Sequence, residues 1–162
     1  TKTALRSLGR RWLHLDEEVR DLDRQIKALV EQVAPALLAR PGIGIHCAAQ
    51  LLITAGGNPD RLTSDAAFAA LCGASPVEAS SGQTERHRLN RGGDRTANNA
   101  LWTIAHVRLV HDPRTRAYSQ KRRARGDSRK DILRVLKRYI AREVFTIIMA
   151  AFNGRSPQPA AA

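Results

Sequence analysis

The chain has 162 residues, of which 43% are hydrophobic and 26% are charged, and its formal net charge is +12. This hydrophobic content excludes wholesale disorder, and no apolar run approaches the roughly 20 residues that a membrane-spanning helix needs. The charge favours a polyanionic partner, namely DNA, RNA or an anionic membrane surface.

The two cysteines, Cys47 and Cys72, show no metal-ligand spacing and lie among apolar residues. A reduced, cytoplasmic protein is therefore the simplest interpretation. No secretory signal is recognisable at the start of the sequence, which begins at Thr1 without a methionine, and we expect the chain to be a piece of a longer protein.

Residues 1–34 are predicted to form a coiled-coil helix through which copies of the chain associate. Apolar side chains alternate there at intervals of three and four, and the mean spacing of 3.5 favours a parallel two-stranded coiled coil. The stripe is narrower than that of a helix packed on a globular core, although packing on its own domain is the alternative. The stripe consists of Leu5, Leu8, Trp12, Leu15, Val19, Leu22, Ile26, Leu29 and Val33.

A Pro-Gly-Ile-Gly turn at residues 41–44 separates two short segments with helical spacing. Glycine permits positive φ and close approach of the backbone, and the helix that follows presents free N–H groups at its positive dipole end. The pattern resembles the helix-hairpin-helix motif of non-sequence-specific DNA-binding proteins, which implies that Gly42 and Gly44 contact a phosphate. The alternative is a helix–helix turn without a ligand.

Residues 74–95 form the longest stretch without helical spacing, and this stretch contains Ser80-Ser81-Gly82. A serine hydroxyl needs activation to act as a nucleophile, for which His87 is a candidate base, and phosphoryl transfer needs cations on the phosphate oxygens. From the residues alone, a surface loop whose arginines only touch phosphates is the better interpretation. The arginines of this stretch are Arg86, Arg88, Arg91 and Arg95.

Most of the positive charge lies beyond residue 33, and it is densest in residues 114–130, which hold eight basic residues and one acidic residue. Asp112 and Pro113 predict the start of a helix there. One face of this helix is suited to a phosphate backbone and to stacking on a base, although a solvated face is the alternative. The face is formed by Arg114, Tyr118, Lys121, Arg122 and Arg125.

Residues 132–148 have helical apolar spacing and are predicted to form a core helix without a functional role. Residues 154–162 are predicted to be a disordered tail. No convincing strand is present in the sequence, although the stretch before Gly92 could form a short hairpin.

Taken in order, the motifs of residues 37–150 resemble the C-terminal half of insertion-sequence transposases of the one-ten/one-sixteen type, relatives of the Piv DNA invertase. The combination is specific, whereas each motif alone is not. The motifs are the turn at 41–44, Leu-Cys-Gly-Ala-Ser-Pro at 71–76, Ala-Ser-Ser-Gly at 79–82, Arg-Leu-Asn-Arg-Gly-Gly-Asp-Arg at 88–95, Asn-Asn-Ala-Leu at 98–101, and Tyr118 before the basic run at 121–126.

This resemblance implies that a serine attacks a DNA phosphodiester and forms a covalent phosphoserine link, and that a structured guide RNA directs the strand exchange. The nucleophile would be Ser80 or Ser81, with Ser80 slightly preferred. The arginines that would hold DNA or the scissile phosphate are Arg86, Arg88, Arg91 and Arg95.

In that family an N-terminal RuvC-like domain carries four acidic residues that bind metal. No part of this sequence resembles that domain, since only the predicted coiled coil precedes the turn at 41–44. We therefore expect Mg²⁺ in a RuvC-like half, no metal or cofactor in this chain, and no activity of the chain by itself.

We predict an all-α protein with a coiled-coil helix at residues 1–34, a compact helical domain containing a helix-hairpin-helix element at 35–153, and a tail at 154–162. The predicted function is that of a DNA transposase or recombinase that uses a serine nucleophile. The alternatives are a non-catalytic module that binds DNA or RNA and dimerises through its first helix, and a structural scaffold. We expect DNA, a guide RNA and further copies of the chain as partners, no membrane partner, and a location at the nucleoid in the bacterial cytoplasm.

Overall fold

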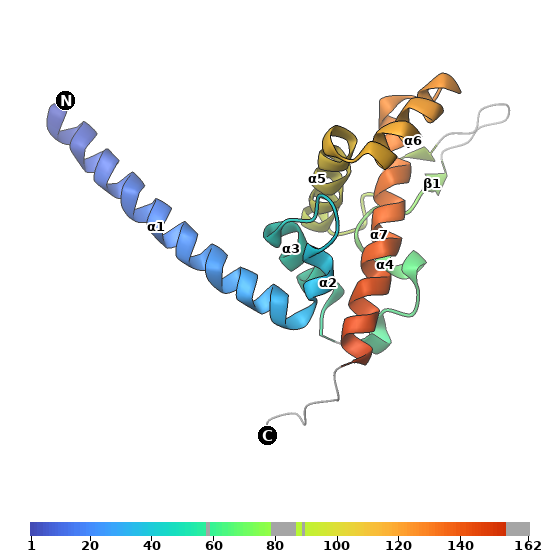
Figure 1. Cartoon of the computed structure of the whole chain (residues 1–162), viewed down its shortest axis with the longest axis horizontal. Helices are drawn as coiled ribbons and strands as arrows, with labels where there is room; N and C mark the ends of the chain where they lie inside the picture. Colours follow the sequence, from blue (N-terminus) through green and yellow to red (C-terminus); the bar gives the residue numbers. More distant parts are fainter. Residues whose placement is uncertain (58, 79–86, 89, 155–162) are drawn as a thin grey trace.

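One long helix extends from a bundle of shorter helices in the computed structural model (Figure 1), which describes residues 1–57, 59–78, 87–88 and 90–154. The helical fold and the long first helix confirm the prediction from the sequence. The elements are α1 (Lys2–Val33), α2 (Pro35–Leu38), α3 (Ile45–Ala55), the 3-10 turn η1 (Pro59–Arg61), α4 (Asp65–Leu71), β1 (Val77–Glu78), β2 (His87–Arg88), α5 (Arg95–His111), α6 (Pro113–Ala124) and α7 (Arg129–Asn153).

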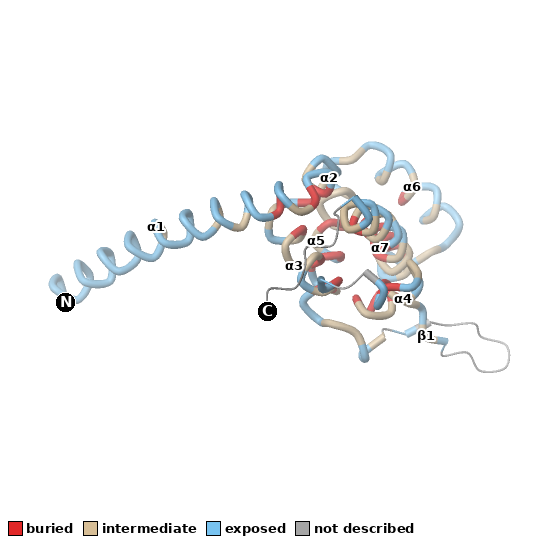
Figure 2. Tube along the Cα trace, turned by 90° about the horizontal axis from the view of Figure 1, so that it is seen from below, coloured by how far each residue is buried: buried red, intermediate tan, exposed pale blue. Residues whose placement is uncertain are grey.

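Most of α1 extends away from the bundle, and its side chains are exposed along that length (Figure 2). Only its last turns contact the domain, where Val30 is 3% exposed and Ile26 and Val33 pack against the core. The predicted stripe is therefore divided between two environments. The exposed apolar residues of the stripe are Leu5, Leu8, Trp12, Leu15, Val19, Leu22 and Leu29.

Helix α7 forms the centre of the core, with α4 and α5 packed along it. One face of α7 is buried at intervals of four residues, as the apolar spacing of this segment predicts. Phe68 of α4 is fully buried, and its ring lies 6.2 Å from that of Phe145. Full burial of a side chain of this size contributes about 2–3 kcal/mol to stability. The buried face consists of Ile132, Leu136, Ile140, Val144 and Ile148.

Short-range hydrogen bonds set the starts of three helices. Ser64 caps α4 by accepting from the amide of Ala67, at 3.1 Å. Asp112 caps α6, as predicted, and Ser128 caps α7. A capping side chain satisfies an amide that has no partner within its helix, and such a cap contributes about 1 kcal/mol.

The two strands pair antiparallel, with Val77 opposite Arg88 and Glu78 opposite His87. This pair is the short hairpin that the sequence left open. Ser80, Ser81 and Arg86 fall between the strands, in the segment 79–86 that lies outside the described residues, and the predicted tail after Gly154 lies outside them too.

The chain crosses itself closely on either side of this hairpin. A Cβ placed on Gly93 would lie 2.2 Å from the amide nitrogen of Gly73 and 2.7 Å from the carbonyl oxygen of Ala70, so that position admits only glycine. The amide of Asp94 donates to the carbonyl oxygen of Leu71 at 2.7 Å. The crossing therefore fixes where the hairpin segment leaves the bundle and where it returns.

Candidate nucleic-acid interface

Two asparagine side chains hold the backbone around the hairpin in place. Asn90 donates to the Ser75 hydroxyl at 2.9 Å and accepts from the amide of Gly92 at 3.0 Å. Asn98 donates to the carbonyl oxygens of Cys72 and Gly73, at 3.0 and 2.8 Å. The bonds of Asn98 join residues far apart in the sequence, so they connect the start of α5 to the end of α4.

Asp94 caps α5 and links it to α3. Its carboxylate accepts from the amides of Thr96 and Ala97, at 2.8 and 3.3 Å, and from the hydroxyl of Thr54 in α3, at 2.7 Å. The hydrogen bond from the Thr96 side chain, followed by that from Thr54, lowers the pKa of Asp94 to about 2. The ionised carboxylate therefore stabilises this corner of the fold.

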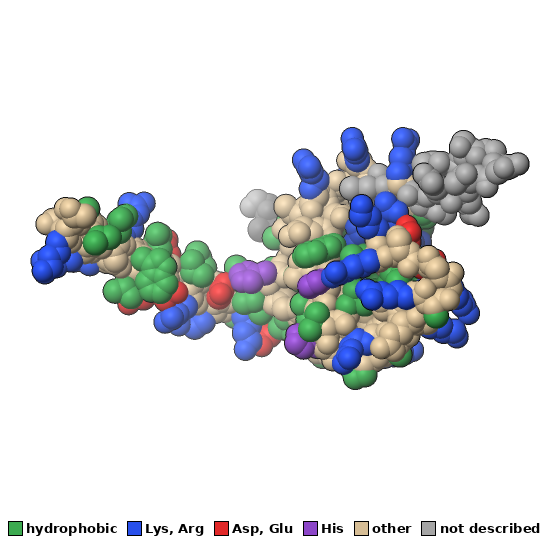
Figure 3. Space-filling view, turned by 90° about the horizontal axis from the view of Figure 1, so that it is seen from above, with side chains coloured by type: hydrophobic (Ala, Val, Ile, Leu, Met, Phe, Trp, Pro, Cys, Tyr) green, Lys and Arg blue, Asp and Glu red, His purple; other side chains and the backbone are tan. Residues whose placement is uncertain are grey.

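An open groove of about 920 Å³ lies between the start of α7, the end of α6 and the backbone around the hairpin. We call it the basic groove, because six of the side chains that line it are cationic and only two, Asp127 and Asp131, are acidic. Figure 3 shows Lys and Arg side chains gathered over the domain on the face seen from above. The cationic residues are Arg88, Arg122, Lys130, Arg134, Lys137 and Arg138.

Three of these arginines already have partners within the chain. Arg122 pairs with Asp127 at 2.6 Å and Arg134 with Asp131 at 2.7 Å, while Arg138 donates to the carbonyl oxygen of Asp65 at 3.0 Å. In the described part of the chain, Arg88 and Lys130 are exposed and have no ion pair. The groove thus offers cations that an external anion can bind without breaking an existing pair.

Lys137 lies in the wall of the basic groove and is only 6% exposed. Its ammonium group donates to the side-chain oxygen of Asn98 at 3.0 Å, and no carboxylate within the described ranges pairs with it. Burial, together with the nearby charge of Arg134, lowers the pKa of Lys137. A buried cation whose partner is a neutral amide retains its attraction for an anion in the groove.

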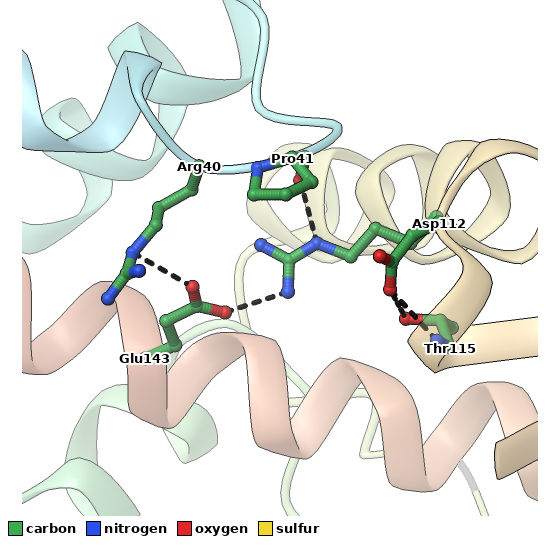
Figure 4. A network of polar contacts seen from close by, with 6 residues as sticks. Arg40, Pro41, Asp112, Thr115 and Glu143 are labelled. Atoms are coloured by element: carbon green, nitrogen blue, oxygen red, sulfur yellow. Dashed lines mark hydrogen bonds and ion pairs between the residues drawn. The ribbon is translucent and has the colours of Figure 1, made fainter. Parts of the chain in front are cut away.

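The turn at 41–44 is attached to α5 and α7 by an arginine–glutamate network (Figure 4). Arg108 donates to the carbonyl oxygen of Pro41 at 2.7 Å, and it also pairs with Glu143 at 2.7 Å. Arg40 lies 3.1 Å from the same carboxylate. Gly42 has a φ of +74°, and a Cβ there would lie 3.3 Å from the carbonyl oxygen of Ile104, so this glycine allows the turn to pack against α5.

A family model described as "Transposase IS116/IS110/IS902 family" matches residues 34–120 of the chain. The chain belongs to this transposase family. It is 33% identical over 147 residues to the "Insertion element IS110 uncharacterized 43.6 kDa protein" of Streptomyces coelicolor, covering 89% of this chain and 36% of that relative. It is 28% identical over 127 residues to the "Insertion element IS900 uncharacterized 42 kDa protein" of Mycobacterium paratuberculosis, covering 76% of this chain and 32% of that relative.

The chain thus spans about a third of the length of these relatives. Within the part of the chain that the structure describes, no helix is long and apolar enough to cross a membrane. The same residues hold no group of three or more His, Cys, Asp or Glu side chains arranged to bind a metal ion.

The structure distributes the predicted site residues of this chain over several surfaces. Arg88 and Arg122 line the basic groove. Arg91 and Arg95 line a second cavity beside α5. Gly44 is exposed at the start of α3, where the phosphate contact remains a prediction. Three further cations are exposed on α6 or at its C-terminal end: Arg114, Lys121 and Arg125.

Tyr118 of the predicted basic face is turned towards α7. It is half-buried, and its ring meets that of Tyr139 edge-on, with 6.2 Å between the ring centres. Burial raises the pKa of its hydroxyl. Because Tyr139 is itself 54% exposed, this residue departs from the apolar core assigned to residues 132–148. The ring of Tyr118 is therefore less available for stacking on a base than the sequence suggests.

The contribution of α7 to the basic groove was not predicted from the sequence, because residues 132–148 were expected to form only a core helix. The missed residues are Lys130, Arg134, Lys137 and Arg138. Their spacings of four, three and one place them on one face of a helix, and this periodicity could have identified them.

We expect Asp94→Asn to weaken the fold by about 1 kcal/mol at neutral pH, after allowance for solvent screening, although asparagine still caps α5. Because folding lowers the pKa of Asp94 to about 2 from its ordinary value of 3.8, the stabilisation is full above about pH 4 and is lost as the pH falls towards 2. Urea unfolding of the variant should therefore show a flatter loss of stability between pH 5 and 2.

Asp16→Asn, which removes a partly exposed carboxylate that pairs with Arg20 on α1, is the matched control and should change stability by less than about 0.5 kcal/mol. Identical pH slopes for Asp94→Asn and the unchanged chain would contradict the role assigned to this carboxylate.

Proposed function

We propose that the chain is the DNA-cleaving and DNA-joining part of an insertion-sequence transposase. It binds DNA phosphates in the basic groove and supplies a serine nucleophile, Ser80 or Ser81, from the segment between β1 and β2. A structured guide RNA directs the reaction, and a RuvC-like half, for which we expect Mg²⁺, completes the enzyme in the bacterial cytoplasm.

One observation carries this proposal: the segment with the two serines joins strands that lie beside a groove with unpaired cations. Arg88 belongs to β2 and also lines the basic groove, so the chain leaves the serine segment next to the cations. Attack on a phosphodiester places negative charge on the phosphate oxygens, which Arg88, Lys130 and Lys137 can stabilise.

The reaction proposed for the serine is a double displacement. The serine oxygen attacks phosphorus as its proton leaves to a base, and the bond from phosphorus to one sugar oxygen breaks to give a phosphoserine and a free sugar hydroxyl. A hydroxyl of another strand then attacks the phosphoserine and releases the serine. Each step breaks one P–O bond and forms another, so strand exchange needs no external energy source.

The second candidate is a non-catalytic module that binds DNA or RNA. Unpaired cations in a groove bind a phosphate backbone whether or not chemistry follows, so the basic groove supports this candidate as well. The two candidates differ in one product, because only the transposase forms a covalent bond between serine and DNA.

We also propose that copies of the chain associate through α1. Its apolar stripe from Leu5 to Leu22 is exposed, whereas Ile26 and Val33 pack on the domain of the same chain. A coiled coil between two copies of α1 would bury the exposed part of the stripe, and the spacing of the apolar residues would set the register of the two helices. We also retain, as part of the proposed binding of nucleic acid, the phosphate contact of the helix-hairpin-helix turn at 41–44.

For the groove, we expect the double variant Arg88→Gln, Lys130→Gln to bind a short DNA duplex roughly tenfold more weakly at low salt. Each lost phosphate contact should also lower the slope of log Kd against log salt concentration by about 0.9. Fluorescence anisotropy measures both quantities. The control, Arg6→Gln with Arg10→Gln, removes the same charge from the exposed part of α1, and an equal effect of both variants would contradict specific binding in the groove.

For the nucleophile, we expect a version joined to its RuvC-like half, incubated with guide RNA and DNA, to yield DNA covalently attached to a serine. Ser80→Ala or Ser81→Ala should abolish that adduct, since alanine has no hydroxyl to attack phosphorus, and peptide mass spectrometry identifies the modified residue. Strand exchange that survives in both variants would disprove the assignment.

For self-association, we expect sedimentation equilibrium to give a mass above that of one chain, and Leu15→Glu to return it to one chain. A charge in the apolar seam of a coiled coil is strongly disfavoured. Leu13→Glu changes another exposed leucine, which lies outside the stripe, and should leave the mass unchanged. A monomer at high concentration for the unchanged chain would refute association through α1.

A further inference from the structure

A stacked pair of aromatic side chains lies on the outer face of α5. Trp102 is 44% exposed, and its ring stacks on that of His106 one turn later, with 5.2 Å between ring centres and 9° between planes. Tryptophan is usually well buried in folded proteins, because its ring is large and mostly apolar. A ring that is held flat by a neighbour and still exposed is suited to accept another flat group.

A second cavity, of about 790 Å³, lies beside Trp102. Arg91 and Arg95 line it, both are exposed, and neither forms an ion pair with any described residue. Asn99 also lines it with an exposed side-chain amide that has no hydrogen bond to the described residues. The cavity therefore combines one aromatic surface with two guanidinium groups and one amide that have no partner among the described residues.

The other two amides of this cavity are already committed. The side chain of Asn98 bonds to two carbonyl groups and to Lys137, and that of Asn90 bonds to Ser75, Ala70 and Gly92. These two residues form a rigid wall, so Asn99 is the amide free to contact a ligand. Asn90 also lines the basic groove, which places the two cavities on either side of the same segment.

We propose that this cavity binds an unpaired nucleotide of a single-stranded nucleic acid. Its base stacks on Trp102, the amide of Asn99 contacts the edge of the base, and Arg91 and Arg95 hold the flanking phosphates. An apolar peptide would not use two unpaired arginines, and a duplex keeps the faces of its bases covered by stacking. This inference rests on the proposed binding of nucleic acid, and it adds a second binding site distinct from the basic groove.

The stack with His106 favours binding because it limits the orientations of the Trp102 ring before the ligand arrives. Asn90 lines both the basic groove and this cavity. A nucleic-acid strand whose phosphates lie in the groove can therefore place an unpaired base past Asn90 into the cavity. RNA and DNA strands share the chemistry that the cavity recognises, and the test below distinguishes them.

The test uses tryptophan fluorescence in the full chain with Trp12→Phe, since Trp102 is then the single tryptophan. Titration with a single-stranded oligonucleotide of DNA or of RNA should quench the fluorescence to saturation. A blunt duplex of the same length should bind without quenching. The strand type with the higher affinity identifies the natural source of the nucleotide.

In the same background, Trp102→Ala should weaken binding of the single strand, measured by anisotropy, by roughly 5- to 100-fold and leave duplex binding unchanged. Trp102→Phe should retain much of the affinity, because phenylalanine keeps an aromatic ring. Val110→Ala removes another exposed apolar side chain from α5 and should have no effect on either ligand.

Equal quenching by duplex and single strand, or an equal loss of affinity for both in Trp102→Ala, would overturn the stacking site. If the duplex binds, but single strands do not quench the fluorescence of Trp102 and their affinity is unchanged in Trp102→Ala, then only the stacking site is wrong. If neither ligand binds, both the stacking site and the proposed function are wrong.

Discussion

The close crossing of the backbone at Gly73 and Gly93 is the constraint on which the arrangement of both cavities depends. It brings the end of α4 against the start of α5, and the amide of Asp94 then reaches the carbonyl oxygen of Leu71 at 2.7 Å. A larger residue at Gly93 would separate the two segments by the width of a side chain. The strands that flank the two serines would then lose their fixed place beside α7.

Hydrogen bonds of an asparagine side chain connect this crossing to a buried lysine. Asn98 satisfies two backbone carbonyl groups at the end of α4 and holds the ammonium group of Lys137 at the same time. Buried polar groups are expensive unless they are hydrogen-bonded, so this network fixes the position of the lysine. A cation held in this way needs little rearrangement when an anion enters the groove.

Charge pairing divides the many basic residues into two groups with different roles. Arg108, Arg122 and Arg142 pair with acids of the same chain and connect its elements. Arg88, Arg91 and Lys130 are exposed and have no such pair in the described residues. Within the described ranges, the cations without an internal ion pair are therefore the ones that remain available to a polyanion.

The sequence by itself determined the helical fold, the helix start at Asp112 and the family, because caps, apolar spacing and motif order depend on residues close together in the chain. Only the tertiary structure decided which of the described cations have a partner within the chain, since pairing depends on distance in space. The ammonium group of Lys137, for example, donates a hydrogen bond to Asn98, which lies 39 positions away in the sequence. It also decided that α1 packs Ile26 and Val33 on its own domain, because a heptad pattern does not specify its partner.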